Sequence, residues 1–186
     1  YLMNFQVNKA IFFDRDGIIN KTLIHNRLPY PPNNLDEFIL TPGIFDILTK
    51  LKTDEFFILV FTNQPDVSRG TQQKSMIDLF HRIILKELPI DKIYACYHDN
   101  SDNCNCRKPR PGMIFQGQVD YNLDLNKCWV IGDRWKDIEA GYNAGCKTIF
   151  LDYDYLEPKP TNSNYNISSL KNILPIIQKN KNLFEK

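Results

Sequence analysis

The sequence has almost no net charge, no long hydrophobic run and no evenly paired set of cysteines, and each absence excludes a class of protein. Its 186 residues hold 23 lysines and arginines against 22 aspartates and glutamates, a formal net charge of +1. A chain so balanced has no global field to hold nucleic acid or an anionic membrane, so any anion must be bound locally. Without a spanning apolar run or the charged-then-apolar order of a signal peptide, a cytoplasmic protein is expected.

The length and overall composition fit one globular domain. Hydrophobic residues make up 42% and charged residues 24%, and a chain of this length buries a core without help from disulfides. We therefore expect a single domain over residues 1–186, with its core at about 9–178. We expect it to be a monomer that acts on a small molecule, with neither nucleic acid nor a membrane as partner.

The five cysteines are odd in number and unevenly spread, whereas a disulfide framework would spread its pairs along the chain. Three of them crowd into one short stretch around a histidine, while Cys128 and Cys146 stand apart and are expected in the core. Three thiols and an imidazole suit a tetrahedral structural zinc site with no open position. Free buried cysteines beside a surface histidine are the alternative. The expected zinc ligands are Cys96, His98, Cys104 and Cys106.

This predicted zinc loop, residues 96–108, runs directly into two cations. Cys106 is followed by Arg107 and Lys108, so a metal would stiffen the loop and aim both side chains at an anion. A phosphate there would gain charge-assisted hydrogen bonds, with arginine as a planar fork and lysine as a point charge. Taken alone, such a basic turn is more often solvated surface, so a role in anion binding depends on which other motifs lie beside it.

Apolar patterns that alternate along the chain predict an α/β fold. Strands alternating with helices imply a mostly parallel sheet with right-handed crossovers, in a Rossmann-like three-layer sandwich. The predicted strands span residues 9–13, 56–61, 92–97, 128–131 and 147–151. The predicted helices span 43–53, 71–88 with Thr71 as N-cap, 111–122, 135–143 and 168–178, the last accommodating Pro175 badly. Residues 27–42 and 152–166 are predicted to be irregular.

Polar residues follow three of these strands, and ligands of parallel sheets bind beyond the carboxyl ends of the strands. Asp14, Thr62 and Asp133 each sit just past a predicted strand. Asp14 and Asp16 flank a turn, and two ionised carboxylates so close repel each other unless a cation such as Mg²⁺ offsets the charge. By itself the pair is more often a polar turn. Asp137 is expected either as a first-turn residue of a helix or as support for the metal.

The motifs together resemble the haloacid dehalogenase superfamily. The match runs from about residue 10 to 150, and four ordered motifs are specific where each alone is weak. They are Asp14 with Asp16, Thr62, Lys108, and Gly132-Asp133 with Asp137. More narrowly, residues 13–17, 62–64 with Arg69 and Gly70, and 104–109 are similar to the group of D-glycero-D-manno-heptose 1,7-bisphosphate phosphatases and histidinol-phosphate phosphatases.

The resemblance implies roles for the catalytic residues. Asp14 would attack phosphorus and form an aspartyl-phosphate, and Asp16 would protonate the leaving oxygen and then activate water. Thr62 and Lys108 would hold the phosphoryl oxygens. Mg²⁺ would sit on Asp14, the Asp16 carbonyl and Asp133, and supply positive charge to the transferring group.

The resemblance also bears on what covers the site. Many superfamily members carry an inserted cap domain, but residues 18–42 are interrupted by prolines and too short to hold a core, so a capless enzyme is expected. Recognition would then fall to residues at the rim of the pocket. The candidates for substrate binding are Asn63, Arg107 and Arg134.

Three phosphatase activities and one binding role remain open at this point. The leading expectation is a heptose 1,7-bisphosphate 7-phosphatase, with histidinol-phosphate phosphatase and nucleic-acid 3′-phosphatase as alternatives. Near-zero net charge argues against long contacts with a nucleic-acid backbone. Pro65 and Asp66 depart from the small residues usual in the heptose group. A catalytically dead binding module is disfavoured because every motif acid is present.

Overall fold

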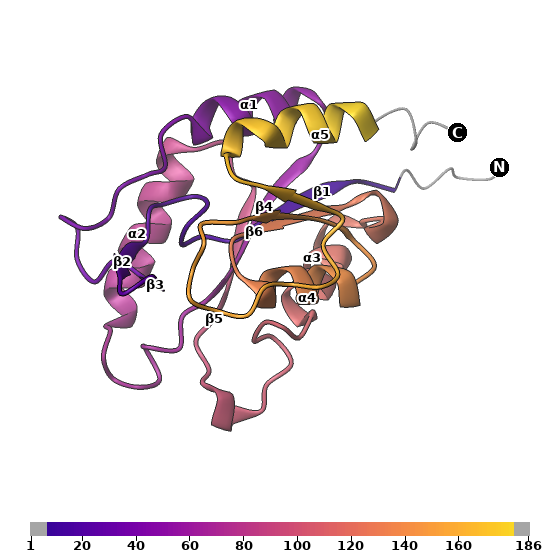
Figure 1. Cartoon of the computed structure of the whole chain (residues 1–186). Coiled ribbons are helices and arrows are strands. Elements are labelled where there is room, and N and C mark those ends of the chain that lie inside the picture. Colours follow the sequence, from indigo (N-terminus) through magenta and orange to yellow (C-terminus); the bar gives the residue numbers. More distant parts are fainter. Residues whose placement is uncertain (1–6, 181–186) are drawn as a thin grey trace.

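Six strands form one parallel sheet in the computed structural model, which describes residues 7–180 (Figure 1). The strand order is β5–β4–β1–β6–β7–β8, and every neighbouring pair runs parallel. The strands are β1 (Ala10–Phe13), β4 (Phe57–Asn63), β5 (Lys92–Cys96), β6 (Trp129–Gly132), β7 (Lys147–Leu151) and β8 (Tyr165–Ile167). The predicted α/β sandwich is confirmed, and the ends of the expected 1–186 domain lie outside the described residues.

Alternate side chains of each strand point to opposite faces of the sheet, and both faces are covered by helices. Ile11 and Phe13 of β1 pack in one core, whereas Ala10 and Phe12 pack in the other. Helices α1 (Ile44–Thr53), α2 (Lys74–Glu87) and α5 (Ile173–Asn180) contribute to the first core, and α3 (Gly112–Tyr121) and α4 (Trp135–Asn143) to the second. Figure 1 shows α1 and α5 above the sheet and α3 and α4 below it.

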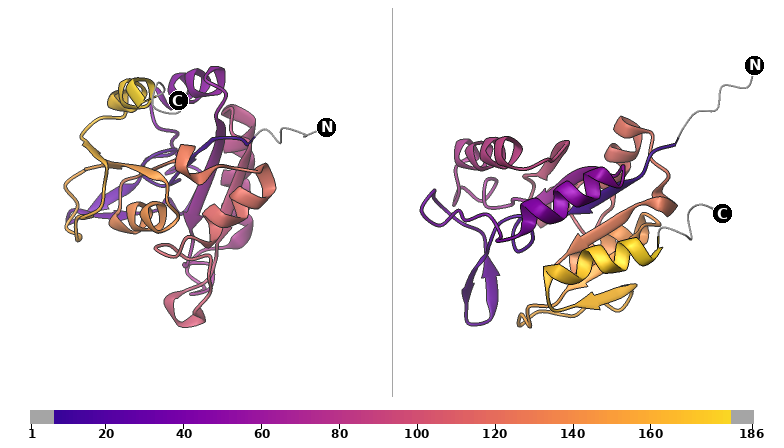
Figure 2. Two further views of the ribbon diagram at one scale, coloured as in Figure 1. Left: turned by 90° about the vertical axis from the view of Figure 1, so that its right-hand side faces the viewer. Right: turned by 90° about the horizontal axis from the view of Figure 1, so that it is seen from above.

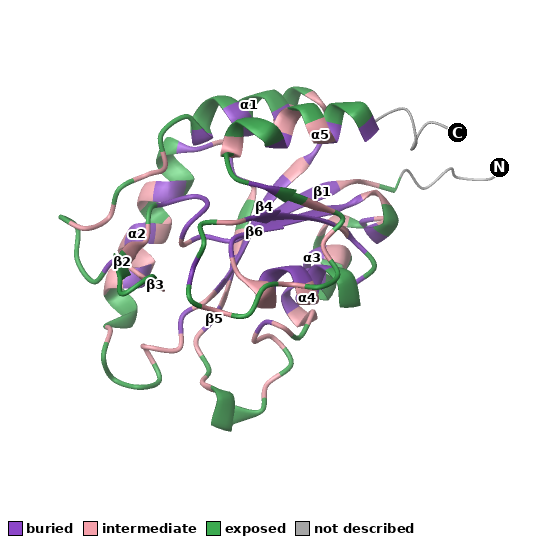
Figure 3. Cartoon of the chain, in the orientation of Figure 1, coloured by how far each residue is buried: buried purple, intermediate pink, exposed green. Residues whose placement is uncertain are grey.

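Burial follows this layering. The central strands are buried along most of their length, and the helices turn buried faces toward them (Figure 3). Short 3₁₀ helices cover Asn100–Asp102 (η1), Leu125–Lys127 (η2) and Leu170–Asn172 (η3). None of the helices between residues 7 and 180 has the length and apolar character needed to cross a membrane.

Two helix starts differ in detail from the sequence prediction. Helix α2 begins at Lys74, so Thr71 is not its N-cap; the Thr71 N–H and hydroxyl both donate to the carbonyl of Asp66 in the preceding turn. Pro175 is accommodated because it is the third residue of α5, where a backbone N–H would have no partner within the helix.

Two segments predicted as irregular contain strands. The edge strand β8 lies within the segment 152–166 and extends one residue beyond it; it is short and carries polar residues, so its pattern was weak. In the segment before α1, β2 (Leu23–His25) and β3 (Leu28–Tyr30) form an antiparallel hairpin. Its two turn residues, Asn26 and Arg27, both have positive φ, as the tight hairpin turns require.

This hairpin stands out from the body of the molecule (right-hand view of Figure 2) and lies in the segment 18–42, which is too short for a cap domain. It carries Pro29 inside β3, which an isolated two-stranded ribbon tolerates because one edge of each strand is free. The expected capless architecture is therefore present, with a hairpin in place of a plain loop.

Candidate active site

A cavity of about 340 Å³ opens at the carboxyl edge of the sheet. Asp14 follows β1, Thr62 lies one residue before the end of β4, and Arg134 and Asp137 follow β6. Residues of the hairpin and of the segment after η1 complete its wall. The lining includes Asp14, Asp16, Thr22, Pro29, Tyr30, Pro31, Thr62, Asn63, Gln64, Pro65, Asp66, Arg69, Asn100, Arg107, Lys108, Arg134, Lys136 and Asp137.

Lys108 is buried between two carboxylates. Its Nζ lies 2.7 Å from Asp14 Oδ1 and 2.7 Å from Asp137 Oδ1, and it also donates to the Phe61 carbonyl at 3.0 Å. Asp14 Oδ1 accepts a second bond from the Arg15 backbone N–H at 2.8 Å. Between residues 7 and 180 no hydrogen bond to Asp14 Oδ2 is found, so both hydrogen bonds of this carboxylate fall on Oδ1.

Asp133 completes a group of three carboxylates that could hold a metal ion. One oxygen each from Asp14, Asp133 and Asp137 lies within 4.8 Å of the others. Asp133 is 1% exposed, and its Oδ1 is buried with no hydrogen-bond partner among the described residues. A buried carboxylate oxygen without a partner is costly, and a cation is the usual way to satisfy it.

The charges of this cluster are out of balance, with three carboxylates against the single ammonium of Lys108. Burial, reinforced by the Asp137 charge, raises the pKa of Asp14 to about 7. Burial and the charge of Asp14 also raise the pKa of Asp133 well above its ordinary range. Burial alone would lower the pKa of Lys108, but the charges of Asp137 and Asp14 outweigh it and raise that pKa. The donor set is all oxygen and electron-rich, which fits a hard divalent cation.

Gly17 is the residue that lets the chain pass this close to the cluster. Its φ of 96° is in the region that favours glycine, and a Cβ there would lie 2.0 Å from Asp133 Oδ2. The turn after β1 therefore needs glycine both for its conformation and for the approach to Asp133.

The Asp16 side chain points into a different network from that of Asp14. Its carboxylate accepts hydrogen bonds from Nε and Nη2 of the fully buried Arg15 at 2.8–3.1 Å. It also accepts from the side-chain amides of Asn20 at 2.9 Å and Gln64 at 2.8 Å. Burial opposes ionisation, but the Arg15 charge and these hydrogen bonds lower the pKa of Asp16. Its side chain is not part of the three-carboxylate group, and the sequence expectation concerned its backbone carbonyl.

The residues 62–64 connect the two networks. Gln64 Nε2 donates to both Thr62 Oγ1 and Asp16 Oδ2 at 2.8 Å. Asn63 lines the cavity, but its side-chain amide is engaged by the backbone of Lys108, accepting from the N–H at 3.0 Å and donating to the carbonyl at 3.1 Å. Asn63 thus fastens β4 to the segment that carries Lys108.

The four predicted zinc ligands lie together after β5. The Cys106 sulfur is 3.1 Å from that of Cys96 and 3.5 Å from that of Cys104, and His98 Nδ1 is 3.3 Å from the Cys106 sulfur. A tetrahedral zinc with Zn–S bonds of about 2.3 Å would separate its sulfurs by about 3.8 Å, close to the spacing found. The soft, compact donor set fits zinc, and Cys128 and Cys146 are buried in the core as expected.

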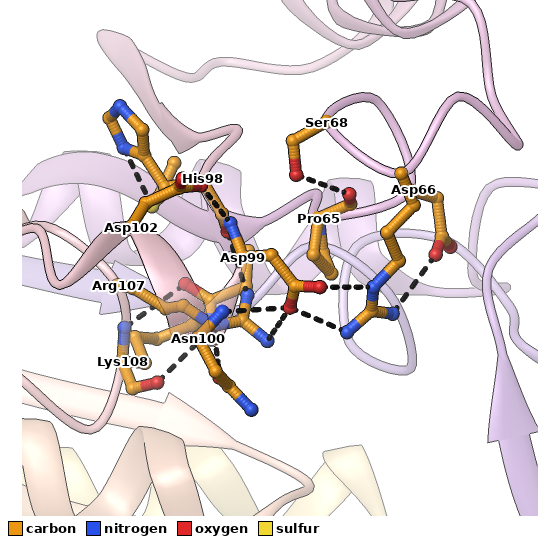
Figure 4. Close-up of polar contacts among 12 residues, drawn as sticks. Pro65, Asp66, Ser68, His98, Asp99, Asn100, Asp102, Arg107 and Lys108 are labelled. Atoms are coloured by element: carbon orange, nitrogen blue, oxygen red, sulfur yellow. Dashed lines mark hydrogen bonds and ion pairs between the residues drawn. The ribbon is translucent and has the colours of Figure 1, made fainter.

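Asp99, in the same loop, ties the rim of the cavity together. It accepts from Arg69 in a bidentate pair at 2.7 and 2.8 Å and lies 3.8 Å from Arg107 Nη2. Figure 4 shows Asp99 between the segment of Pro65 and Asp66 on one side and Arg107 on the other. Arg107 also donates to Asn100 Oδ1 at 2.8 Å and to the His98 carbonyl at 3.2 Å, so its guanidinium is held at the rim.

A second pair of cations, at the start of α4, also lines the cavity wall. Arg134 pairs with Glu157, whereas Lys136 forms no ion pair within residues 7–180. Burial, and then the charges of Arg134 and Arg107, lower the pKa of Lys136. This wall therefore carries positive charge that an anion would offset.

Several of these residues were not found from the sequence. Lys136, Arg15 and Gln64 sit inside recognised motifs but were passed over because their positions are not the motif acids. Lys136 directly precedes Asp137, just as Arg107 precedes Lys108 and Arg134 follows Asp133, so adjacency to a motif residue was the signal that could have found it. Tyr155 carried no signal, since its contact with Asp133 depends on how a long irregular segment folds back.

Known proteins resemble the chain in sequence and in fold. A family model described as HAD-hydrolase-like matches residues 105–165. The D-glycero-beta-D-manno-heptose-1,7-bisphosphate 7-phosphatase of Helicobacter pylori is 33% identical over 91% of this chain and 95% of that protein. The D-glycero-alpha-D-manno-heptose-1,7-bisphosphate 7-phosphatase of Campylobacter jejuni is 34% identical over 77% of this chain and 81% of that protein.

A solved structure shares the fold. The D,D-heptose 1,7-bisphosphate phosphatase from B. bronchiseptica, crystallised with magnesium and phosphate, aligns with a TM-score of 0.77. The alignment covers 93% of this chain and 99% of that one, at 24% identity.

The burial of Lys108 between carboxylates makes a prediction about stability. In magnesium-free buffer at pH 8, Lys108→Met should lower the free energy of unfolding by about 3–5 kcal/mol, because it leaves buried carboxylates unpaired. The loss should be smaller at pH 6. The folded Asp14 carboxyl has a pKa of about 7 against an ordinary 3.8, so at pH 6 it is mostly protonated and depends less on Lys108.

Urea unfolding of both proteins at the two pH values measures this difference. The control is Lys52→Met, which removes the half-exposed ion pair between Lys52 and Asp91 and should cost no more than about 1 kcal/mol at either pH. Equal losses for Lys108→Met at pH 6 and pH 8 would contradict the buried-charge account.

Proposed function

Since this chain belongs to the family of haloacid dehalogenase-like heptose-1,7-bisphosphate 7-phosphatases and is a phosphatase, we propose that it hydrolyses a heptose 1,7-bisphosphate at its 7-phosphate through an aspartyl-phosphate on Asp14. The observation that supports the chemistry best is the pairing of Asp14 Oδ1 with buried Lys108 in a residue that lines the cavity, with no hydrogen bond to Oδ2 among the described residues. A nucleophile and a phosphate-binding cation are thereby held side by side.

The reaction would proceed in two displacements. In the first, Asp14 Oδ2 forms a bond to phosphorus while the bond to the sugar oxygen breaks, and Asp16 gives that oxygen its proton. In the second, Asp16 takes a proton from water, whose oxygen attacks phosphorus and breaks the bond to Asp14. Inorganic phosphate leaves, and Asp14 and Asp16 return to their starting forms. Thr62 and Lys108 would hold the phosphoryl oxygens throughout.

The contacts of Asp16 fit the second displacement as they stand. Arg15, Asn20 and Gln64 favour its ionised form, which is the form that acts as a base. For the first displacement, the Asp16 carboxylate must be protonated, so it must lose at least one of its hydrogen bonds from the Arg15 guanidinium. We therefore propose that substrate binding changes the Arg15–Asp16 contact.

We propose two metal ions. Asp14 and Asp133, with Asp137 beside them, would hold Mg²⁺, which supplies positive charge to the transferring phosphoryl group. Cys96, His98, Cys104 and Cys106 would hold a structural zinc that fixes the course of the chain into Arg107 and Lys108. Because three thiols so close together would be oxidised in a disulfide-forming compartment, we propose that the protein works in the cytoplasm.

The choice of a bisphosphate rests on the positive charge around the cavity. Arg107 is held at the rim, and Lys136 lines the same cavity with no carboxylate paired to it in the described part of the chain. Each charge-assisted contact to a second phosphate would contribute roughly 1.5–3 kcal/mol, or about one to two decades in specificity. Histidinol phosphate offers a cationic amine, for which this wall is a poor neighbour. The relatives' names include both anomers, and the contacts described do not separate them.

The nucleophile is tested by Asp14→Asn. Turnover should fall to background, because an amide cannot form the acyl phosphate, while the melting temperature should not drop, since one of three crowded negative charges has gone. Phosphate release and thermal unfolding measure the two effects. Beryllium fluoride with magnesium should raise the melting temperature of the wild type and not of the variant. Substantial turnover by Asp14→Asn would rule out the covalent route.

The zinc is tested by metal analysis and by Cys104→Ser. We expect about one zinc per chain in the wild type, and in the variant a loss of zinc, melting temperature and activity together. Cys146→Ser, a core cysteine outside the cluster, is the control and should keep its zinc. A zinc-free preparation with full activity and an unchanged melting temperature would show that the cluster has no structural role.

The substrate is tested by comparing kcat/KM on heptose 1,7-bisphosphate, a heptose monophosphate and histidinol phosphate. The bisphosphate should be preferred, and Arg107→Ala should lower its kcat/KM about 10- to 100-fold with little effect on the monophosphate. The control is Arg110→Ala, because Arg110 is nearby in sequence but is bonded to Asn103 and the Cys104 carbonyl. It should leave the ratio of kcat/KM on the bisphosphate to kcat/KM on the monophosphate unchanged.

Two outcomes would overturn the substrate proposal. One is a preference of the wild type for histidinol phosphate or for a 3′-phosphorylated oligonucleotide. The other is an Arg107→Ala variant whose kcat/KM falls equally on the bisphosphate and the monophosphate. Arg107 would then stabilise the loop and would not bind a second phosphate.

A further inference from the structure

The two oxygens of the Asp133 carboxylate have different surroundings. Oδ1 is buried and has no hydrogen-bond partner within the described residues, whereas Oδ2 accepts from the Tyr155 hydroxyl at 2.8 Å. The Gly17 backbone closes the space next to Oδ2. Asp133 is therefore held through Oδ2, and Oδ1 remains without a protein partner in a residue that lies beside Asp14 and Asp137.

Tyr155 reaches Asp133 from the segment that follows β7. It is 7% exposed, and its ring packs against Tyr153 with the centroids 5.7 Å apart. Its hydroxyl also lies 3.2 Å from Thr22 Oγ1. A phenol carries one proton, so when Tyr155 donates to Asp133 the Thr22 hydroxyl must donate to Tyr155. The resulting chain of hydrogen bonds runs from Thr22 through Tyr155 to Asp133.

Thr22 gives this chain a connection to the substrate cavity. It lines that cavity and directly precedes β2, the first strand of the hairpin. Asp133, Tyr155 and Thr22 come from three separate segments of the sequence, and none of the three lies in a helix or strand. The Tyr155 hydroxyl is the one atom in the described residues that contacts both other side chains.

We propose that Tyr155 is a positioning residue that fixes the Asp133 carboxylate with Oδ1 toward the divalent cation, and that Thr22 holds Tyr155 in place. The inference rests on the proposed magnesium site. Without the hydroxyl, Asp133 could rotate about its side-chain torsions and share its charge between both oxygens. Partners of metal ligands that lie one shell further out typically contribute 10- to 100-fold in metal affinity.

Tyr155→Phe tests the proposal because it removes the hydroxyl and keeps the ring. Magnesium affinity is measured without substrate, by calorimetry and by the magnesium-dependent rise in melting temperature of the zinc-loaded protein. The dissociation constant should rise about 10- to 100-fold. At saturating magnesium, KM for the substrate should stay close to that of the wild type, which a general disturbance of the cavity would not allow.

Tyr153→Phe is the matched control. Its hydroxyl comes from the same segment but donates to the Gly17 carbonyl at 3.1 Å, so its loss should leave magnesium affinity unchanged. Thr22→Val is a milder variant that keeps the inference testable if Tyr155→Phe does not fold. It should weaken magnesium binding about two- to tenfold, the effect of one neutral hydrogen bond.

The outcomes separate this inference from the proposed function. If the wild type binds magnesium and Tyr155→Phe binds it equally well, the positioning role is wrong and the magnesium phosphatase stands. If Tyr153→Phe loses as much affinity as Tyr155→Phe, the effect belongs to the loop and the role is again wrong. Wild-type protein that binds no magnesium would overturn the metal site and this inference together.

Discussion

The buried contact of Lys108 with Asp14 and Asp137 is the interaction on which the rest of the site depends. It takes one cation into the protein interior among three carboxylates, where an unpaired charge would be very costly. The surrounding structure holds that contact in place. Asn63 clamps the backbone of Lys108 and Gly17 allows the close approach to Asp133, while the four-residue cysteine and histidine cluster ends at Cys106, two residues before Lys108.

The cavity owes its character to a second set of contacts, which link loops to one another. Asp99 bridges Arg69 and Arg107 across the rim, and Gln64 bridges Thr62 and Asp16 deeper down. Loops joined by bidentate or paired polar contacts lose less entropy when a ligand binds, because they are already ordered. A phosphatase without a cap domain can in this way present a preformed pocket.

The fold was largely predictable because its strands are short apolar runs separated by amphipathic helices, and the motif residues fall at the strand ends. Reasoning from strand ends therefore brought Asp14, Thr62 and Asp133 to one edge of the sheet, where the structure has them. It failed where the pattern is weak or the contact is distant. The hairpin at 23–30 and the edge strand β8 are too short and polar to show the alternation of apolar and polar residues that predicts a strand. Tyr155 contacts Asp133 only because a long irregular segment folds back.

The order of strands in the sheet has a consequence for how the chain acquires its activity. Strand β1 is made first, yet its neighbours are β4 and β6, so Ile11 pairs with Ile58 and with Trp129, residues far apart along the chain. Such non-local parallel pairing is slow to form, since long loops must close before the contacts are made. Asp14 meets Asp133 only when β6 has docked. Assembly of the carboxylate group is therefore a property of the completed fold, and a nascent chain that ends before β6 holds Asp14 without Asp133.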